Sequence, residues 1–165
     1  MRLPLIVVVA LVLTLPAYAA DPEPPVTVMV PRLSMDMAMK LAKAGIDSCR
    51  KQGVNVAITV VDRSGHPQVV LRDTLAMDLA LNISRMKAYT AMTFNMPTSQ
   101  MVNRFPGAYS VPKVDSIIIS AGGLPITGRG QILGGVGVSG APSGTQDESC
   151  AKAGIDAVRF DLESN

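Results

Sequence analysis

Residues 117–140 constrain the fold more than any other stretch, because their sequence, IIISAGGLPITGRGQILGGVGVSG, alternates short apolar runs with glycine pairs. Short runs of β-branched and apolar residues bounded by Gly, Pro or Ser are typical of strands. We predict three strands here, at residues 116–120, 124–127 and 131–138, the last two joined by a turn at Gly128-Arg129-Gly130. Such strands require helices or a second sheet to cover their apolar faces.

A hairpin is predicted earlier in the chain. Residues 54–61 alternate in the manner of a strand, and a second strand follows at residues 66–72. Between them, Asp62-Arg63-Ser64-Gly65 has the composition of a turn.

Helical spacing predicts the remaining elements. Ser34 is expected to cap a helix that stops at Gly53 and carries apolar residues at Met35, Met39, Ala42, Ile46 and Cys49. Further helices are predicted at residues 78–94, 98–102 and 145–160. The order of elements indicates an α+β domain, an antiparallel five-stranded sheet flanked by helices, rather than a doubly wound fold.

The N-terminus has the pattern of a secretory signal peptide at residues 1–19. Arg2 precedes an apolar run, and Ala17-Tyr18-Ala19 matches a small-x-small cleavage site. The run is too short to span a bilayer core of ~30 Å, which argues against a membrane anchor. We therefore expect export, to the periplasm in a Gram-negative bacterium, of a chain with an extended arm at residues 20–32 and one domain at residues 33–165.

Charge and motifs exclude several classes of function. The formal net charge is only +2, so no strong field attracts nucleic acid or an anionic membrane. No G-x-G-x-x-G opens a helix after a strand, and Ser139 does not lie in a nucleophile elbow. The one histidine excludes a bis-His haem or a three-His zinc centre within a subunit. Whether the protein is an enzyme stays open.

Cys49 and Cys150 are the only cysteines. In an oxidising compartment such a pair indicates a disulfide, provided that the first and last helices pack antiparallel. Two separate buried cysteines are the alternative, and the absence of a CxxC spacing disfavours a redox or metal site.

Several motifs together resemble the GlcG/HbpS family. In chain order they are Val61-Asp62-Arg63-Ser64-Gly65-His66, Lys87-Ala88-Tyr89-Thr90-Ala91, Pro97-Thr98, Gly122-Gly123-Leu124-Pro125, Gly137-Val138-Ser139-Gly140 and Asp147. The resemblance extends over residues 33–158. It departs at residues 71–74, LRDT, which lack the Met and Gly that the family has after this strand.

The resemblance implies a GlcG-like, profilin-related fold that assembles into oligomers, often octamers. Some members of the family bind haem or another planar cofactor. Others occur beside functions of glycolate or diol utilisation, so the family alone does not fix the ligand.

The candidate ligand residues lie in two places. His66, in the hairpin turn, offers one axial bond to haem iron, although a turn histidine is often only solvated. Lys87, Tyr89 and Thr90 form the second place, where Lys87 would pair with a haem propionate or a small carboxylate, as Arg72 would bidentately. The alternatives for Lys87 are a salt bridge to a partner subunit or simple exposure to solvent.

The methionines suggest a weaker hypothesis. Met35-x-Met37-x-Met39 resembles a thioether site for Cu(I), but on a helix Met37 points away from the other two. We interpret these residues as packing residues.

Two functions follow from the sequence. The first is an exported haem- or tetrapyrrole-binding protein with His66 as iron ligand. The second is an accessory protein or enzyme that acts on a small carboxylate or aldehyde such as glycolate, in a pocket at a subunit interface. In both, a homo-oligomer is expected, and a third hypothesis makes the arm a clasp on a neighbouring subunit.

Overall fold

The computed structural model describes residues 23–102, 104, 105 and 111–164. The expected signal peptide lies outside these ranges, as do the first three residues of the expected arm.

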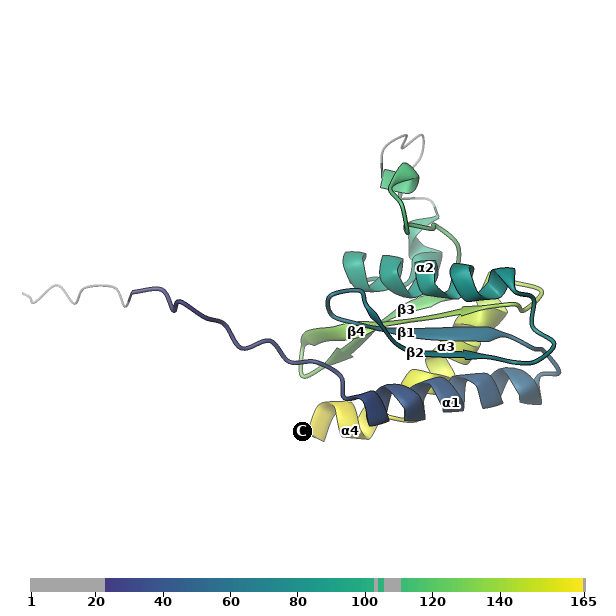
Figure 1. The fold of residues 1–165 in the computed structure, drawn as a ribbon, viewed down its shortest axis with the longest axis horizontal. Helices are drawn as coiled ribbons and strands as arrows, with labels where there is room; N and C mark the ends of the chain where they lie inside the picture. The colour runs from purple at the N-terminus through teal and green to yellow at the C-terminus, as the bar shows by residue number, and fades with distance from the viewer. Residues whose placement is uncertain (1–22, 103, 106–110, 165) are drawn as a thin grey trace, which may run out of the picture.

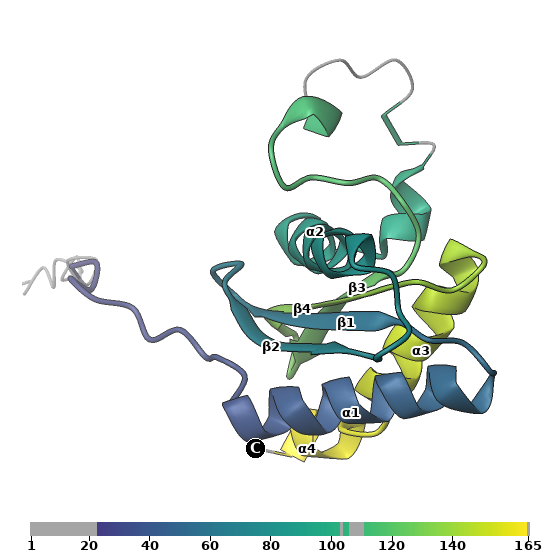
Figure 2. The same ribbon diagram turned by 45° about the vertical axis from the view of Figure 1, so that its right-hand side comes forward.

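The described residues form one antiparallel sheet covered on both faces. Its strands are ordered β2-β1-β4-β3, where β1 is Ala57–Asp62, β2 is Pro67–Arg72, β3 is Gly123–Gly128 and β4 is Gln131–Ser139. Helix α2 (Leu79–Phe94) covers one face (Figure 1). The other face carries α1 (Met35–Lys51), α3 (Gly144–Asp156) and α4 (Arg159–Ser164), as the turned view in Figure 2 shows. The α+β class is therefore confirmed.

The prediction of a fifth strand was wrong, because the described sheet has four. Residues 117–120 have no strand partner. Ser116 has a positive φ of 73°, and the Ile118 N–H donates to the Thr90 hydroxyl at 3.0 Å instead of to a neighbouring strand. The Ile118 N–H, which would have to bond to a neighbouring strand, is therefore already bonded to a side chain of helix α2.

The helices follow the sequence with two corrections. Ser34 caps α1 as expected, since its hydroxyl accepts from the Met37 N–H at 3.3 Å. The buried face of α1 is Ala38, Leu41, Ala42, Gly45, Ile46 and Cys49, whereas Met35 and Met39, expected on that face, are exposed. The single closing helix predicted at residues 145–160 is instead α3 and α4, separated at Ala157 and Val158. Two short 3-10 helices, Thr98–Met101 and Val111–Lys113, complete the described elements, and none of the described helices is long and apolar enough to cross a membrane.

Glycines of β4 allow α2 to lie unusually close to the sheet. A Cβ at Gly137 would stand 2.1 Å from the Ser84 carbonyl oxygen, and one at Gly135 would stand 2.3 Å from the Ala88 carbonyl oxygen. Real side chains cannot occupy that space, so these positions require glycine for close approach. Beside this contact, the fully buried hydroxyls of Thr59 on β1 and Ser84 on α2 hydrogen-bond at 2.8 Å.

A disulfide joins α1 to α3 on the opposite face. The bond connects Cys49 and Cys150, which are 101 residues apart in the chain and fully buried. In the chain-entropy account, closing a loop of this length restricts the unfolded state and stabilises the fold by up to ~4.7 kcal/mol.

We predict that the double substitution Cys49→Ala, Cys150→Ala lowers the free energy of unfolding by about 2–5 kcal/mol. Urea titrations with and without dithiothreitol measure the change, and the reductant should destabilise only the unmodified chain. Equal stability of the two chains, each insensitive to reductant, would contradict a bridge between these residues.

Candidate functional site

The β1–β2 turn holds His66 at the surface of a well-ordered loop. The Asp62 side chain, only 10% exposed, accepts from the backbone N–H groups of Ser64 at 2.8 Å and His66 at 3.0 Å. Gly65 closes the turn with a φ of 83°, a conformation that suits glycine. The backbone of the turn is therefore fixed, while the His66 side chain is 79% exposed and its Nδ1 lies 3.8 Å from Asp62 Oδ1.

Arg32, at the base of the arm, braces the same turn. Its guanidinium donates to Asp62 Oδ2 at 3.0 Å and to the Ser64 hydroxyl at 3.2 Å. The Arg32 side chain nevertheless remains 57% exposed. Sequence reasoning missed this residue, because 30 positions separate it from Asp62 and no local pattern joins them.

Tyr89 packs against the turn from α2. A Cβ built at Gly65 would lie 2.6 Å from two carbons of the Tyr89 ring, so the glycine and the ring are in close contact. The structure thus brings two of the predicted residues, His66 and Tyr89, to one hairpin turn, with Tyr89 half-buried.

Lys87 and Thr90 point into the fold. Lys87 is 3% exposed, and its ammonium donates to Asp147 Oδ2 at 2.8 Å and to the Val138 carbonyl at 3.0 Å. Thr90 is fully buried and accepts from the Ile118 N–H. Both side chains bind other parts of this chain, whereas the sequence alternatives for Lys87 were a partner subunit or solvent.

Asp147 completes this buried ion pair at the start of α3. Its second oxygen accepts from the Ala141 N–H at 3.0 Å. Burial raises the pKa of the Asp147 carboxyl above its usual value, although the Lys87 ammonium and the Ala141 N–H act to lower it. Since the folded state holds the proton more tightly than the unfolded state, this group favours folding most at acidic pH, and that contribution is lost as pH rises through the folded pKa.

Arg72 stands apart from the ion pair. It is exposed at the end of β2, and its guanidinium donates to the carbonyl of Ala76, four residues further on.

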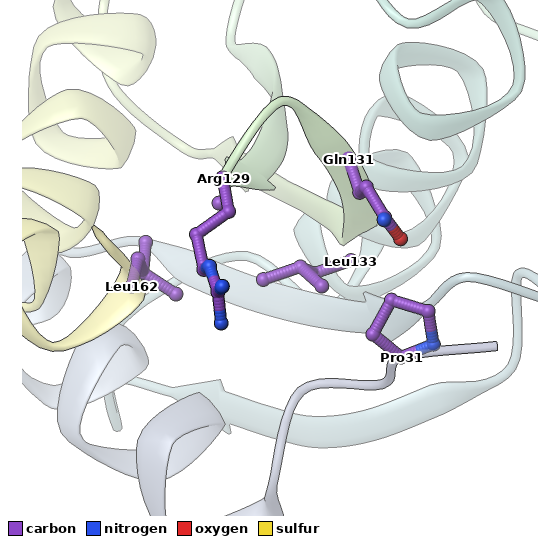
Figure 3. Close-up of a pocket in the computed structure, with 6 residues that line it drawn as sticks. Pro31, Arg129, Gln131, Leu133 and Leu162 are labelled. Carbon is purple, nitrogen blue, oxygen red and sulfur yellow. The ribbon is translucent and has the colours of Figure 1, made fainter. Parts of the chain in front are cut away.

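Two shallow grooves adjoin the base of the arm. The first, of about 320 Å³, is lined by Pro31, Gly128, Arg129, Gln131, Leu133 and Leu162. In Figure 3 the Arg129 side chain points into it, between Leu162 and Leu133. The second, of about 240 Å³, shares Pro31, Leu133 and Leu162 and adds Arg32 and Met37 among its lining residues. None of the ligand residues predicted from the sequence lines either groove.

Arg32 connects the second groove to the turn of His66, because it lines the groove and bonds to Asp62 and Ser64. Within the described ranges no three His, Cys, Asp or Glu side chains gather as a metal site would require.

Comparison with known proteins identifies the family of this chain. The family model described as "Haem degrading protein HbpS-like" matches residues 33–156. GlcG of Escherichia coli K12 is 37% identical over 111 residues, covering 65% of this chain and 81% of that protein.

Solved structures agree with this match. A double mutant of HbpS from Streptomyces reticuli superimposes with a TM-score of 0.78 at 34% identity, covering 87% of this chain and 99% of that one. PduOC, solved as a haem complex, gives a TM-score of 0.71 at 24% identity, over 76% of this chain and 94% of that one. At that identity the likeness to PduOC shows the fold alone.

We predict that Lys87→Met lowers the free energy of unfolding by about 3–5 kcal/mol at pH 7, because it leaves the Asp147 carboxylate buried without a counter-charge. The loss should be smaller at pH 4.5, since protonating Asp147 removes that charge. Urea unfolding at both pH values measures it.

Lys152→Met is the matched control. Lys152 pairs with Asp156 on the exposed side of α3, with side chains 64% and 40% exposed, so its replacement should change stability by less than ~0.5 kcal/mol. A Lys87→Met deficit that is the same at both pH values would contradict the role given to Asp147.

Proposed function

Because the chain belongs to the GlcG/HbpS family, whose model describes HbpS-like haem-degrading proteins, we propose that it binds haem with His66 as the iron ligand. The observation that carries the proposal is the exposed imidazole of His66 on a turn whose backbone is fixed by Asp62. A ligand residue that is accessible but held in place loses little freedom on binding.

The chemistry of the turn fits such a ligand. The Asp62 carboxylate oxygen lies 3.8 Å from Nδ1, too far for a hydrogen bond, but its negative charge favours the tautomer that carries the proton on Nδ1. That tautomer leaves the Nε2 lone pair for iron. The haem iron would supply the redox chemistry when bound, and the residues of this chain bind and orient the group.

Neighbouring side chains offer contacts for the rest of the ligand. The half-exposed Arg32 lies where the turn meets the second groove, so its guanidinium is placed to meet a propionate. Tyr89 offers an aromatic ring beside the turn. Lys87 has no part in this proposal, because Asp147 already neutralises it inside the fold.

The small-carboxylate hypothesis loses its main support for the same reason. It relied on Lys87 as a cation in a pocket, and the ammonium is 3% exposed and bonded to Asp147 and Val138. No contact of the described residues favours it over haem.

Export to the periplasm is also part of the proposal. The Cys49–Cys150 bridge supports it, since disulfides persist in oxidising compartments. Cell fractionation followed by mass spectrometry of the mature N-terminus tests it, and a cytoplasmic chain that retains Met1 would overturn it.

We predict that haemin titrated into the chain from Ala20 onward gives a saturable Soret change, and that His66→Ala weakens binding at least tenfold or alters the spectrum. His66→Met, which keeps a side chain able to ligate iron, should retain binding with a shifted spectrum.

Arg63→Ala is the matched control on the same turn and should leave the spectrum unchanged. Tight binding that is indifferent to His66→Ala would move the ligand elsewhere. No binding at micromolar haem would overturn the proposed function.

A further inference from the structure

The two edges of the sheet differ in how their backbone groups are used. At the β3 edge, the Val138 N–H of β4 donates to the carbonyl of Gly122, directly before β3. The alternate residues Gly123 and Pro125 therefore direct their backbone groups outward. Pro125 has no N–H to offer. The Gly123 N–H donates to the Thr98 hydroxyl at 2.9 Å, and its carbonyl accepts from the same hydroxyl at 3.4 Å. This edge is closed to another strand.

The β2 edge is open. The Asp73 N–H donates to the Val56 carbonyl. Because alternate residues of an antiparallel strand bond to the same neighbour, Leu71 and Val69 also bond to β1. The backbone groups of Val70 and Arg72 therefore face away from the sheet. Within the described residues no strand lies beyond β2, and the Val70 side chain is 46% exposed there. Such an edge is a template for a further strand.

The arm has the composition of a strand that lacks a partner. Residues 26–30, VTVMV, lie between Pro25 and Pro31, and each of the five retains its N–H. β-Branched residues of this kind favour extended backbone. Their side chains are exposed, with Val28 at 76% and Val26 and Met29 almost completely exposed. A run of solvated apolar side chains beside an otherwise packed domain indicates a surface that another molecule covers.

The contacts at the base of the arm direct it away from its own β2. Leu33 is buried, and its carbonyl accepts from the Gln68 side chain at 2.9 Å, at the start of β2. Arg32 is fixed to the turn, and beyond it the arm runs outward from the body in both views (Figures 1 and 2). To pair with its own edge, the chain would have to reverse direction at Pro31 and break the contacts of Arg32.

We propose that the arm of one copy adds as a strand to the outer edge of β2 in a second copy of this chain. Five extended residues span about 17 Å, close to the ~20 Å of the six-residue β2. The main-chain groups of Val70 and Arg72 supply the hydrogen bonds, and the arm valines bury apolar surface beside Val70. The proposal rests on the edge and the arm, and is independent of haem.

Three variants test the proposal on the chain from Ala20 onward. Deleting residues 23–30 removes the donor strand. Val70→Pro removes an N–H that faces outward, so the β1–β2 ladder keeps its own bonds. Val70→Thr keeps the N–H and the β-branched shape, and is the matched control.

Sedimentation velocity and amide exchange give the first readout. The unmodified chain and Val70→Thr should assemble, with amides 70 and 72 protected. The deletion and Val70→Pro should each reduce the assembly and expose these amides. A monomeric unmodified chain, or an assembly and protection unchanged by the deletion, would overturn the proposal.

Mixing the two defective copies gives the second readout. The arm-deleted copy keeps an intact edge and the Val70→Pro copy keeps an intact arm, so together they should form a one-to-one pair. If Val70→Pro does not fold, Val28→Pro replaces it in the first readout. This substitution lies in the exposed arm and removes an N–H that the arm would need to pair as a strand. If the chain is a monomer and its β2 amides lose protection when the arm is deleted, the arm pairs with its own β2. That result would overturn the proposal that a second copy is the partner.

Discussion

The close approach of α2 to β4 is the contact on which the rest of the structure depends. It is possible because Gly135 and Gly137 leave room for the carbonyls of Ala88 and Ser84. Once α2 lies at that depth, its inner side chains cannot reach solvent, and Lys87 must find its counter-charge inside the fold, at Asp147. The motif around Lys87 and the motif at residues 137–140 are therefore two sides of one packing contact. Both motifs therefore have a structural role in building the fold.

Much of the architecture could be predicted because its causes are local. The Ser34 cap, the β1–β2 hairpin and the extent of α2 depend on neighbouring residues, and the structure has each of them. The fifth strand failed because a residue 28 positions away, Thr90, takes the Ile118 donor. On α1 the predicted face was right at Ala42, Ile46 and Cys49, which are buried. It was wrong at Met35 and Met39 in the first turns, which are exposed.

The candidate site could be predicted only in part, for a similar reason. His66 was found by its type and by its place in a turn. Asp62 was recognised as a turn residue, but its carboxylate also organises the backbone at Ser64 and His66 and receives Arg32. Arg32 and Asp62 are 30 positions apart, and no local pattern in the sequence predicts that they bond. The grooves beside the arm were missed altogether, because their walls come from the arm, the β3–β4 turn and α4.

The bridge between Cys49 and Cys150 has a topological consequence. It makes residues 49–150 a covalent ring that contains α2 and the four strands of the sheet. Most of α1 lies before the ring, and the end of α3 and all of α4 lie after it, so both tails begin at the disulfide. A protease that cut one peptide bond within the ring would leave both fragments attached until the sulfurs were reduced. A cut in the arm would release the residues before the cut at once, because the two cysteines lie after the arm and no bridge holds it.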